Sequence, residues 1–109
     1  MATTIPESAS PTTDAKETGI VVRFSPTNLT SEKYDETVRR MKQDGAWPPD
    51  GLELHVLFGP DDKLRVSEVW ASRAQFDAIG ERLMPILKDV GIEFASDPEI
   101  LEVRNLITR

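Results

Sequence analysis

Hydrophobic and polar residues alternate along two neighbouring runs in the middle of the chain, residues 52–58 and 64–70. An alternation with a period of two is typical of β-strands that bury one face. Between the runs lies Gly59-Pro60-Asp61-Asp62-Lys63, which favours a turn because proline presets φ and aspartate can accept hydrogen bonds from the nearby backbone. The pattern predicts a β-hairpin, and the rest of the chain is arranged so that it can cover this hairpin.

The length of the turn decides which side chains share a face, because a shift of one residue exchanges the two faces of a strand. An odd-numbered loop puts Glu68 and Trp70 on one face and His55 on the other. An even-numbered loop puts His55 opposite Glu68, with Trp70 on the same side. We favour the odd-numbered loop, because it gathers the remaining apolar side chains of the hairpin on the Glu68 face: Leu52, Leu54, Val56, Phe58, Leu64 and Val66.

Apolar side chains spaced three to four residues apart predict one helix before the hairpin and one after it. The first covers residues 30–44, where Thr30 is a suitable N-cap, and the second covers residues 72–90, where Ser72 begins a capping box. Pro85 should kink or split the second helix near its middle, because proline lacks an N–H and its ring crowds the preceding turn.

Two further strands are expected at residues 19–25 and 99–107, which completes the order β-α-β-β-α-β. This order predicts an α+β, ferredoxin-like fold, in which a four-stranded antiparallel sheet carries two helices on one face. The opposite face would be too apolar to stay bare, so we expect a homodimer that packs through it. Its expected apolar members are Val21, Leu57, Val69, Ile100 and Leu106, among Arg23, Arg65 and Arg104.

The composition limits the classes of protein and of partner. The chain has 109 residues, of which residues 1–18 are rich in Thr, Ser, Pro and Ala and are expected to form a flexible tail before one domain of residues 19–109. The net charge of −6 and the lack of a basic run argue against nucleic acid or an anionic membrane as a partner. No apolar run is long enough to span a membrane.

Residue types that commonly hold metals or cofactors are scarce. Cysteine is absent, which excludes disulfides, thiolate metal sites and cysteine nucleophiles and agrees with a cytoplasmic protein. His55 is the only histidine, and the pair Asp61-Asp62 is better explained by the turn than by a metal site. There is no phosphate-binding glycine loop and no nucleophile elbow. We therefore expect neither a metal nor a cofactor.

The segment Val69-Trp70-Ala71-Ser72, followed by Ala74-Gln75-Phe76, combines a tryptophan at a strand end, a capping serine and a buried phenylalanine. Together with the order of elements over residues 19–107, it resembles the dimeric α/β-barrel superfamily, and within it the antibiotic-biosynthesis-monooxygenase-like domains. The resemblance implies a dimeric α/β barrel with a pocket between sheet and helices, often lined by a tryptophan like Trp70. The superfamily includes cofactor-free monooxygenases, haem-degrading enzymes, polyketide cyclases and decarboxylases.

Two departures from the family pattern narrow what the resemblance implies. Haem-degrading relatives use a histidine on the second helix, and residues 72–91 contain none, so we do not expect haem degradation. Those relatives and some of the oxygenases also use an asparagine on the first strand. This strand has none, and Asn105 falls on the last predicted strand, so it is not a match.

His55 and Glu68 are the candidate catalytic residues. The pKa of an ordinary imidazole suits a general base near neutral pH, although a histidine on a strand can also lie at the surface or at a dimer interface. Glu68 could orient His55, act as an acid or base itself, or pair with an arginine. Among apolar residues its pKa would rise, because desolvation disfavours the charged form, whereas at the sheet margin it would be an ordinary solvated carboxylate.

The candidate substrate-binding residues are Trp70, Tyr34, Phe76 and Asn105. The three aromatic side chains would wall the pocket, and Tyr34 could contact a ligand or pack on the sheet as an ordinary helix residue. Asn105 could donate to an oxyanion, or its amide could fill its own hydrogen bonds at a strand end. Trp47, in the linker between the first helix and the hairpin, could cover one end of the core or contact a partner.

Two function classes follow. The first is an enzyme, a cofactor-free monooxygenase or a cyclase, that removes a proton from a small aromatic or polyketide-like substrate. The second is a non-catalytic dimeric module that binds a small ligand or another protein. An apolar pocket onto which Glu68 and Asn105 converge favours the enzyme. A filled core with His55 in solvent favours the binding module.

Overall fold

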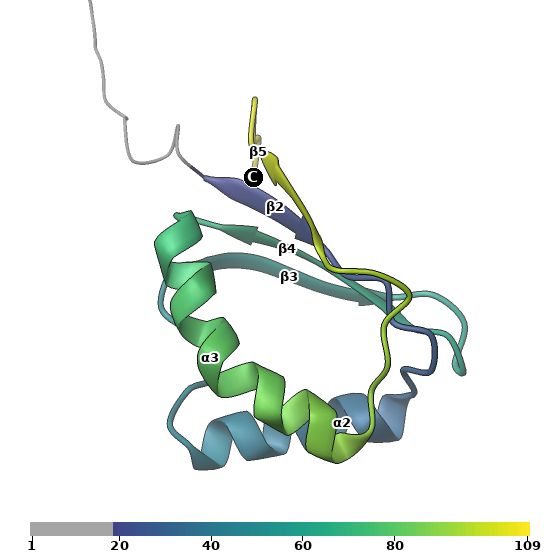
Figure 1. Cartoon of the computed structure of the whole chain (residues 1–109). Coiled ribbons are helices and arrows are strands. Elements are labelled where there is room, and N and C mark those ends of the chain that lie inside the picture. Colours follow the sequence, from purple (N-terminus) through teal and green to yellow (C-terminus); the bar gives the residue numbers. More distant parts are fainter. Residues whose placement is uncertain (1–18) are drawn as a thin grey trace, which may run out of the picture.

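The computed structural model describes residues 19–109, in which a four-stranded antiparallel sheet carries two helices on one face (Figure 1). The elements follow the order β2 (Ile20–Arg23), α2 (Ser31–Gln43), β3 (Leu52–Phe58), β4 (Arg65–Trp70), α3 (Arg73–Val90) and β5 (Glu99–Glu102). The strands lie side by side in the order β3-β4-β2-β5. The predicted ferredoxin-like fold is therefore confirmed. The predicted tail, residues 1–18, lies outside the described residues.

Both helices begin at the predicted caps. The Thr30 side chain accepts a hydrogen bond from the Lys33 N–H, and Ser72 accepts one from the Gln75 N–H, each at 3.2 Å. Pro85 does not split α3, which is one continuous helix from Arg73 to Val90. Of the expected kink or split, the split was wrong, because α3 continues through the proline and packs Ile79 and Leu87, one on each side of it, into the core. No helix within residues 19–109 is long and apolar enough to cross a membrane.

The favoured register of the hairpin was wrong, and the even-numbered alternative is the one observed. His55 pairs with Glu68. The last pair before the turn is Phe58 with Arg65, so residues 59–64 form the loop. Leu64 belongs to the loop rather than to β4, because its N–H bonds to the Leu29 carbonyl at 3.0 Å and its side chain is buried. The loop therefore has an even number of residues.

A β-bulge at the start of β3 shifts the pairing with β4 by one residue at the open end of the hairpin. The pairing shifts between Leu52 and Leu54, which returns Leu52 to the position opposite Trp70. Leu52 consequently packs against the core, whereas Leu54 is 48% exposed on the other face. Bulges of this kind re-aim side chains at the ends of strands.

The side chains of the core lie between the inner face of the sheet and the two helices. Trp70 is 1% exposed, Val22 is fully buried, and Met41 of α2 is 2% exposed. A second group of buried side chains lies toward the other end of the helices, and it consists of Leu29, Leu64, Val66, Leu87 and Ile92. The apolar stripes of both helices thus meet the inner face of the sheet as their spacing predicts, whereas Leu54, Val56 and Phe58 of β3 face away from the core.

The outer face of the sheet is apolar, and Val21 and Val69 pair with each other on it as expected. The other expected apolar members are not part of it: Leu106 is past the end of β5. Leu57 and Ile100 point toward the helices and pack against the core, because of the even register and of the pairing of β5 with β2. The exposed apolar side chains of the outer face come instead from the alternate positions of β3 and β5: Leu54, Val56, Phe58 and Leu101.

The last strand is shorter than predicted. β5 ends at Glu102, which pairs with Ile20, the first residue of β2. The chain beyond Glu102 makes one more backbone hydrogen bond to this region, from the Val103 N–H to the Gly19 carbonyl. Residues 104–109 therefore lie past the end of the sheet and are exposed.

Candidate functional site

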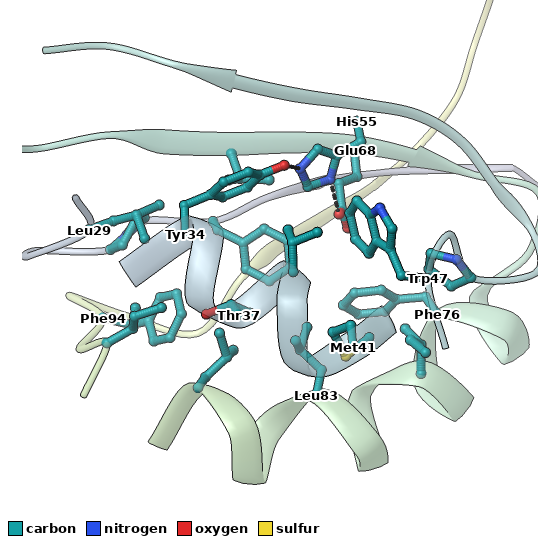
Figure 2. A pocket seen from close by; sticks show the side chains of 18 of the residues that line it. Leu29, Tyr34, Thr37, Met41, Trp47, His55, Glu68, Phe76, Leu83 and Phe94 are labelled. Atoms are coloured by element: carbon teal, nitrogen blue, oxygen red, sulfur yellow. Dashed lines mark hydrogen bonds and ion pairs between the residues drawn. The ribbon is translucent and has the colours of Figure 1, made fainter. Parts of the chain in front are cut away.

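A cavity lies between the inner face of the sheet and the two helices (Figure 2). Its volume is about 80 Å³, measured as the space that the centres of water molecules can occupy. One water needs about 10–15 Å³ on this measure, so the space is not a filled core. Aliphatic and aromatic side chains form most of the wall. Apart from two indole rings, the polar side chains that line it are Tyr34, Thr37, His55 and Glu68.

Glu68 is a buried carboxylate at the middle of β4, between β3 and β2. The residue is 8% exposed, and both of its carboxylate oxygens have a partner. Oε1 accepts a hydrogen bond from the Trp70 indole Nε1 at 2.9 Å, and Oε2 lies 2.6 Å from His55 Nδ1. Buried carboxylates are stable only with such partners, so the site holds Glu68 in one orientation.

His55 connects Glu68 to the first turns of α2. Its Nδ1 faces the carboxylate, and its Nε2 lies 2.8 Å from the Tyr34 hydroxyl. A carboxylate accepts hydrogen bonds and cannot donate them, so it favours the tautomer with the proton on Nδ1. Nε2 then carries the lone pair and accepts the hydrogen bond that Tyr34 donates. Figure 2 shows the three side chains as one connected row beside the sheet.

Tyr34 is the end of this row. Burial raises the pKa of its hydroxyl above the usual value, and the negative charges of Glu68 and Asp35 raise it further. The hydroxyl therefore keeps its proton at neutral pH and donates it to His55. Thr37, the other hydroxyl at the wall, donates to the Lys33 carbonyl of its own helix at 2.8 Å.

The rings around this row hold it in place. The Trp47 ring stands edge-on to the His55 ring with the centroids 5.2 Å apart, and the Tyr34 ring lies 5.7 Å away from it. On the other side, Phe76 packs against Trp70 in a T-shaped arrangement at 5.6 Å. Edge-on pairs of this kind restrict the orientation of both rings. The imidazole therefore has both nitrogens bonded and an indole ring against it.

The structure brings together five of the six predicted site residues, since Tyr34, Glu68, Trp70 and Phe76 line the cavity together with His55. Asn105 does not join them. It lies beyond the end of β5, which stops at Glu102, and it is exposed. The expectation that its amide reaches the pocket was wrong.

Trp47 was not among the predicted site residues, although the structure places it in the cavity wall. The linker brings it there: the Ala46 N–H bonds to the Met41 carbonyl, and the Leu52 N–H bonds to that of Pro49. A tryptophan beside two prolines was the only signal in the sequence, and it does not say which way the ring points.

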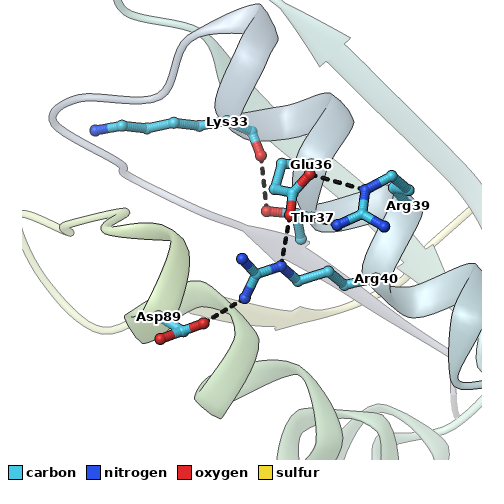
Figure 3. Close-up of polar contacts among 6 residues, drawn as sticks. All are labelled: Lys33, Glu36, Thr37, Arg39, Arg40 and Asp89. Atoms are coloured by element: carbon cyan, nitrogen blue, oxygen red, sulfur yellow. Dashed lines mark hydrogen bonds and ion pairs between the residues drawn. The ribbon is translucent and has the colours of Figure 1, made fainter.

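A second polar cluster joins α2 to α3 away from the cavity (Figure 3). Arg40 bonds to Glu36 through Nε at 2.7 Å and reaches Asp89 of α3 with Nη1. Hydrogen bonds from Arg39 and Arg40 lower the pKa of Glu36 to about 2. Every side chain of this cluster has a partner on the helices, so the cluster is structural. Among residues 19–109, no group of three or more His, Cys, Asp or Glu side chains could hold a metal ion.

Several solved structures share this arrangement of strands and helices. A mutant form of SnoaB, a cofactor-independent oxygenase from Streptomyces nogalater, is 17% identical with a TM-score of 0.55, over 84% of this chain and 96% of that one. A monooxygenase of Streptomyces coelicolor in complex with nanaomycin D is 15% identical with a TM-score of 0.50, over 88% and 95%. A conserved protein from Methanosarcina mazei is 16% identical with a TM-score of 0.50, over 85% and 98%.

Comparisons of the amino-acid sequence alone find no relative. No protein-family model matches the chain, and no curated protein has significant similarity to it. At identities of 17% and below, the similarity of the structures establishes the fold.

Proposed function

We propose that this chain, which has the fold of the antibiotic-biosynthesis-monooxygenase-like domains, is a cofactor-independent monooxygenase for a small aromatic or polyketide-like substrate. One observation carries the proposal: a row of hydrogen-bonded side chains, Tyr34, His55 and Glu68, borders an otherwise apolar cavity. A partly buried base beside a largely apolar cavity is what proton abstraction from a weakly acidic carbon or hydroxyl needs.

In this mechanism His55 is the general base and Glu68 is its orienting partner. Nε2 accepts the proton that leaves the substrate, directly or by way of Tyr34, and the carboxylate at 2.6 Å stabilises the imidazolium that forms. General-base catalysis of this kind contributes about 10²–10⁴-fold to a rate. The same three-part arrangement, in which a carboxylate orients a histidine and the histidine faces a hydroxyl, operates in hydrolases of unrelated fold.

Dioxygen is the second substrate in this proposal. The deprotonated substrate gives one electron to dioxygen, and the resulting radical and superoxide combine to form a carbon–oxygen bond. The peroxide takes back the proton from His55 and loses water, so that a CH₂ group and one O₂ become a carbonyl group and one H₂O. The apolar wall protects the carbanion and the radical from protonation by bulk water.

One observation favours the second candidate, a non-catalytic binding module. The polar groups of the site already satisfy one another, because Tyr34 donates to His55, and Glu68 accepts from both His55 and Trp70. Such a row is stable without any substrate, as a passive cavity also requires.

A cyclase that uses the same deprotonated substrate to form a carbon–carbon bond would need no dioxygen.

We also propose that two copies pack through the outer face of the sheet to form a dimeric α/β barrel. Leu54, Val56, Phe58 and Leu101 are between 40% and 48% exposed there. Val69 and Val21 connect the two edges, because Leu54 pairs with Val69, Val69 with Val21 and Val21 with Leu101, and such an apolar patch is typical of an interface. A cytoplasmic location is part of the proposal, and the absence of cysteine supports it.

The test is conversion of a neutral carbon acid, such as anthrone, with and without dioxygen. The proposal predicts conversion that requires dioxygen and falls about 10²–10⁴-fold in Glu68→Gln. Glu81→Gln is the matched control, because Glu81 is an exposed carboxylate on α3 outside the cavity. Tight binding without any turnover would favour the binding module, and cyclisation of an open-chain polyketide-like substrate without dioxygen would favour the cyclase.

A further inference from the structure

Tyr34 is placed to lose an electron and a proton together. Its hydroxyl lies 2.8 Å from His55 Nε2, and the tautomer that Glu68 favours leaves a lone pair on that nitrogen. The loss of an electron turns a phenol into a strong acid, so the oxidation of tyrosine near neutral pH requires a base that takes the proton. Figure 2 shows this base, the His55 ring, already bonded to the hydroxyl.

The charges of the row favour this oxidation. At rest Glu68 is a carboxylate beside a neutral histidine and a neutral tyrosine. After oxidation the tyrosyl radical is neutral, and His55 is an imidazolium whose charge faces the Glu68 oxygen at 2.6 Å. Opposite charges at this distance stabilise each other, most of all where little water screens them. The side chains of His55 and Glu68 are only 17% and 9% exposed, so water screens this pair weakly.

The raised pKa of the Tyr34 hydroxyl makes the base essential. Burial is the main cause of the raised pKa, and the charges of Glu68 and Asp35 add to it. The phenolate, which loses an electron easily, is therefore absent near neutral pH, and the neutral phenol reacts only if its proton leaves. Within residues 19–109 the other titratable side chains at the cavity wall are His55 and Glu68, and the hydroxyl bonds to His55.

Tyr34 also lies beside a second ring that can be oxidised. The Tyr34 ring is 5.7 Å from the His55 ring, and the Trp47 ring is 5.2 Å from it on a centroid measure. Tyr34 and Trp47 both line the cavity. An oxidising radical in the cavity can therefore take an electron from either ring, and Tyr34 can replace an electron lost from Trp47. Both routes end in the same tyrosyl radical, because only Tyr34 has a base bonded to its proton.

We propose that Tyr34 is a hydrogen-atom donor that quenches neutral peroxyl radicals in the cavity, with His55 as the proton acceptor and Glu68 as its positioning residue. An electron passes from Tyr34 to the peroxyl radical, and the Tyr34 proton moves to His55 Nε2. The peroxyl anion that forms takes a proton from the His55 imidazolium and becomes a hydroperoxide. One O–H bond breaks and one forms. A thiol in solution then returns one hydrogen atom to the tyrosyl radical.

This role goes beyond the proposed oxygenase and uses none of its steps, because it requires no carbanion and no bound substrate. The oxygenase removes a proton from a substrate and leaves Tyr34 unchanged. The quenching reaction oxidises Tyr34 itself. A protein with either activity can therefore lack the other.

Pulse radiolysis measures the quenching reaction in the intact protein. The trichloromethylperoxyl radical is a neutral one-electron oxidant, and the absorption band of the tyrosyl radical reports Tyr34 alone, since Tyr34 is the only tyrosine. We expect the tyrosyl radical to form faster in the folded protein than in the urea-unfolded chain, where no base is bonded to the hydroxyl. Because a proton moves with the electron, the reaction of the folded protein should be slower in deuterium oxide.

Glu68→Gln is the decisive variant, and Glu81→Gln is its control. A glutamine that donates to Nδ1 moves the His55 proton to Nε2 and removes the lone pair that faces Tyr34. Formation of the tyrosyl radical should then slow by about 10²-fold, the lower end of the range for a positioned base. It should keep its rate in Glu81→Gln, because Glu81 is exposed on α3 outside the cavity. In Tyr34→Phe a tryptophanyl radical should persist in its place.

Three results would each overturn the proposal: equal rates in the folded and unfolded chains, equal rates in water and deuterium oxide, or an unchanged rate in folded Glu68→Gln. The first two comparisons use the wild-type chain, so they decide the matter even if Glu68→Gln does not fold. A tryptophanyl radical that persists in the wild type as long as in Tyr34→Phe would also overturn it.

Discussion

His55 lies directly opposite Glu68 across the β3–β4 pair, and its Nδ1 is 2.6 Å from the carboxylate Oε2. The even-numbered loop of the hairpin creates this contact, because a shift of one residue would turn His55 to the outer face of the sheet. The same register puts Trp70, whose indole N–H bonds to Glu68, on the inner face. The length of the turn thus determines whether His55 meets Glu68 on the inner face of the sheet.

Replacement of Glu68 by glutamine should reverse the tautomer of His55. The carboxylate accepts a hydrogen bond from Nδ1, whereas a glutamine can keep its oxygen on the Trp70 indole and donate from its amide to Nδ1. The proton would then move to Nε2, and the lone pair that faces Tyr34 would be lost. Because His55 is the only histidine, nitrogen-15 NMR of the imidazole reports the tautomer without ambiguity. An unchanged tautomer in Glu68→Gln would contradict the role given to Glu68.

Tyr34 should titrate above its ordinary pKa of 10.0, chiefly because it is partly buried and also because Glu68 and Asp35 are near. Tyr34 is the only tyrosine, so the ultraviolet absorbance of tyrosinate measures its pKa directly. We expect the native protein to titrate at higher pH than the urea-unfolded chain. Equal midpoints would show that the hydroxyl is solvated and not held by His55.

The same shift has a consequence for stability. Since the folded pKa is raised, the unfolded chain releases this proton first, and the free energy of unfolding falls as the pH rises through about 10 toward the folded pKa. Below that range the contribution of Tyr34 is fully present. Urea unfolding at a series of alkaline pH values should show a steeper loss for the wild type than for Tyr34→Phe, which has no such group to ionise.

Phe76→Ala should destabilise the protein by about 2–3 kcal/mol, below the ~3–5 kcal/mol typical of a fully buried phenylalanine. The reason for the smaller value is that Phe76 is only half-buried, although its ring packs against Trp70 and Phe24. Met84→Ala is the control on the same helix, because Met84 is 59% exposed and should change stability by less than about 0.5 kcal/mol. Chemical denaturation measures both, and equal effects would show that Phe76 does not support the cavity wall.

Val56→Asp should convert the proposed dimer into monomers. Val56 is 40% exposed on the outer face of the sheet, so an aspartate there is harmless in a monomer but would place a charge inside a sheet-to-sheet interface. Met84→Asp, on α3, should leave the dimer intact. Sedimentation velocity at micromolar concentration gives the answer, and a monomeric wild type would refute the interface.

The local patterns of the sequence predicted the elements and the fold, because caps and periodicity are local properties. Thr30 and Ser72 cap the helices as expected. The register escaped prediction because Leu54, Val56 and Phe58 are apolar but face outward, so grouping the apolar residues on one face favoured the wrong loop. What decides it is a contact distant in sequence, the bond from the Leu64 N–H to the Leu29 carbonyl.

The sequence predicted most residues of the site but was wrong about Asn105 and did not include Trp47. In both cases the position depends on contacts between segments distant in sequence. Asn105 is on a run that alternates well, yet the length of β5 depends on where β2 begins, at Ile20. Trp47 reaches the cavity because the linker from α2 runs over its edge, and no periodic pattern describes a linker. Tyr34 and His55 meet only once the register and the helix position are both known.

The most direct test of the proposed oxygenase is mass spectrometry of the product formed from a neutral carbon acid such as anthrone under isotopically heavy dioxygen. The account predicts that the new carbonyl contains one heavy oxygen atom, that one molecule of dioxygen is consumed for each product, and that Glu68→Gln forms the product about 10²–10⁴-fold more slowly. Formation of the product at the same rate in Glu68→Gln, or a product without heavy oxygen, would contradict it.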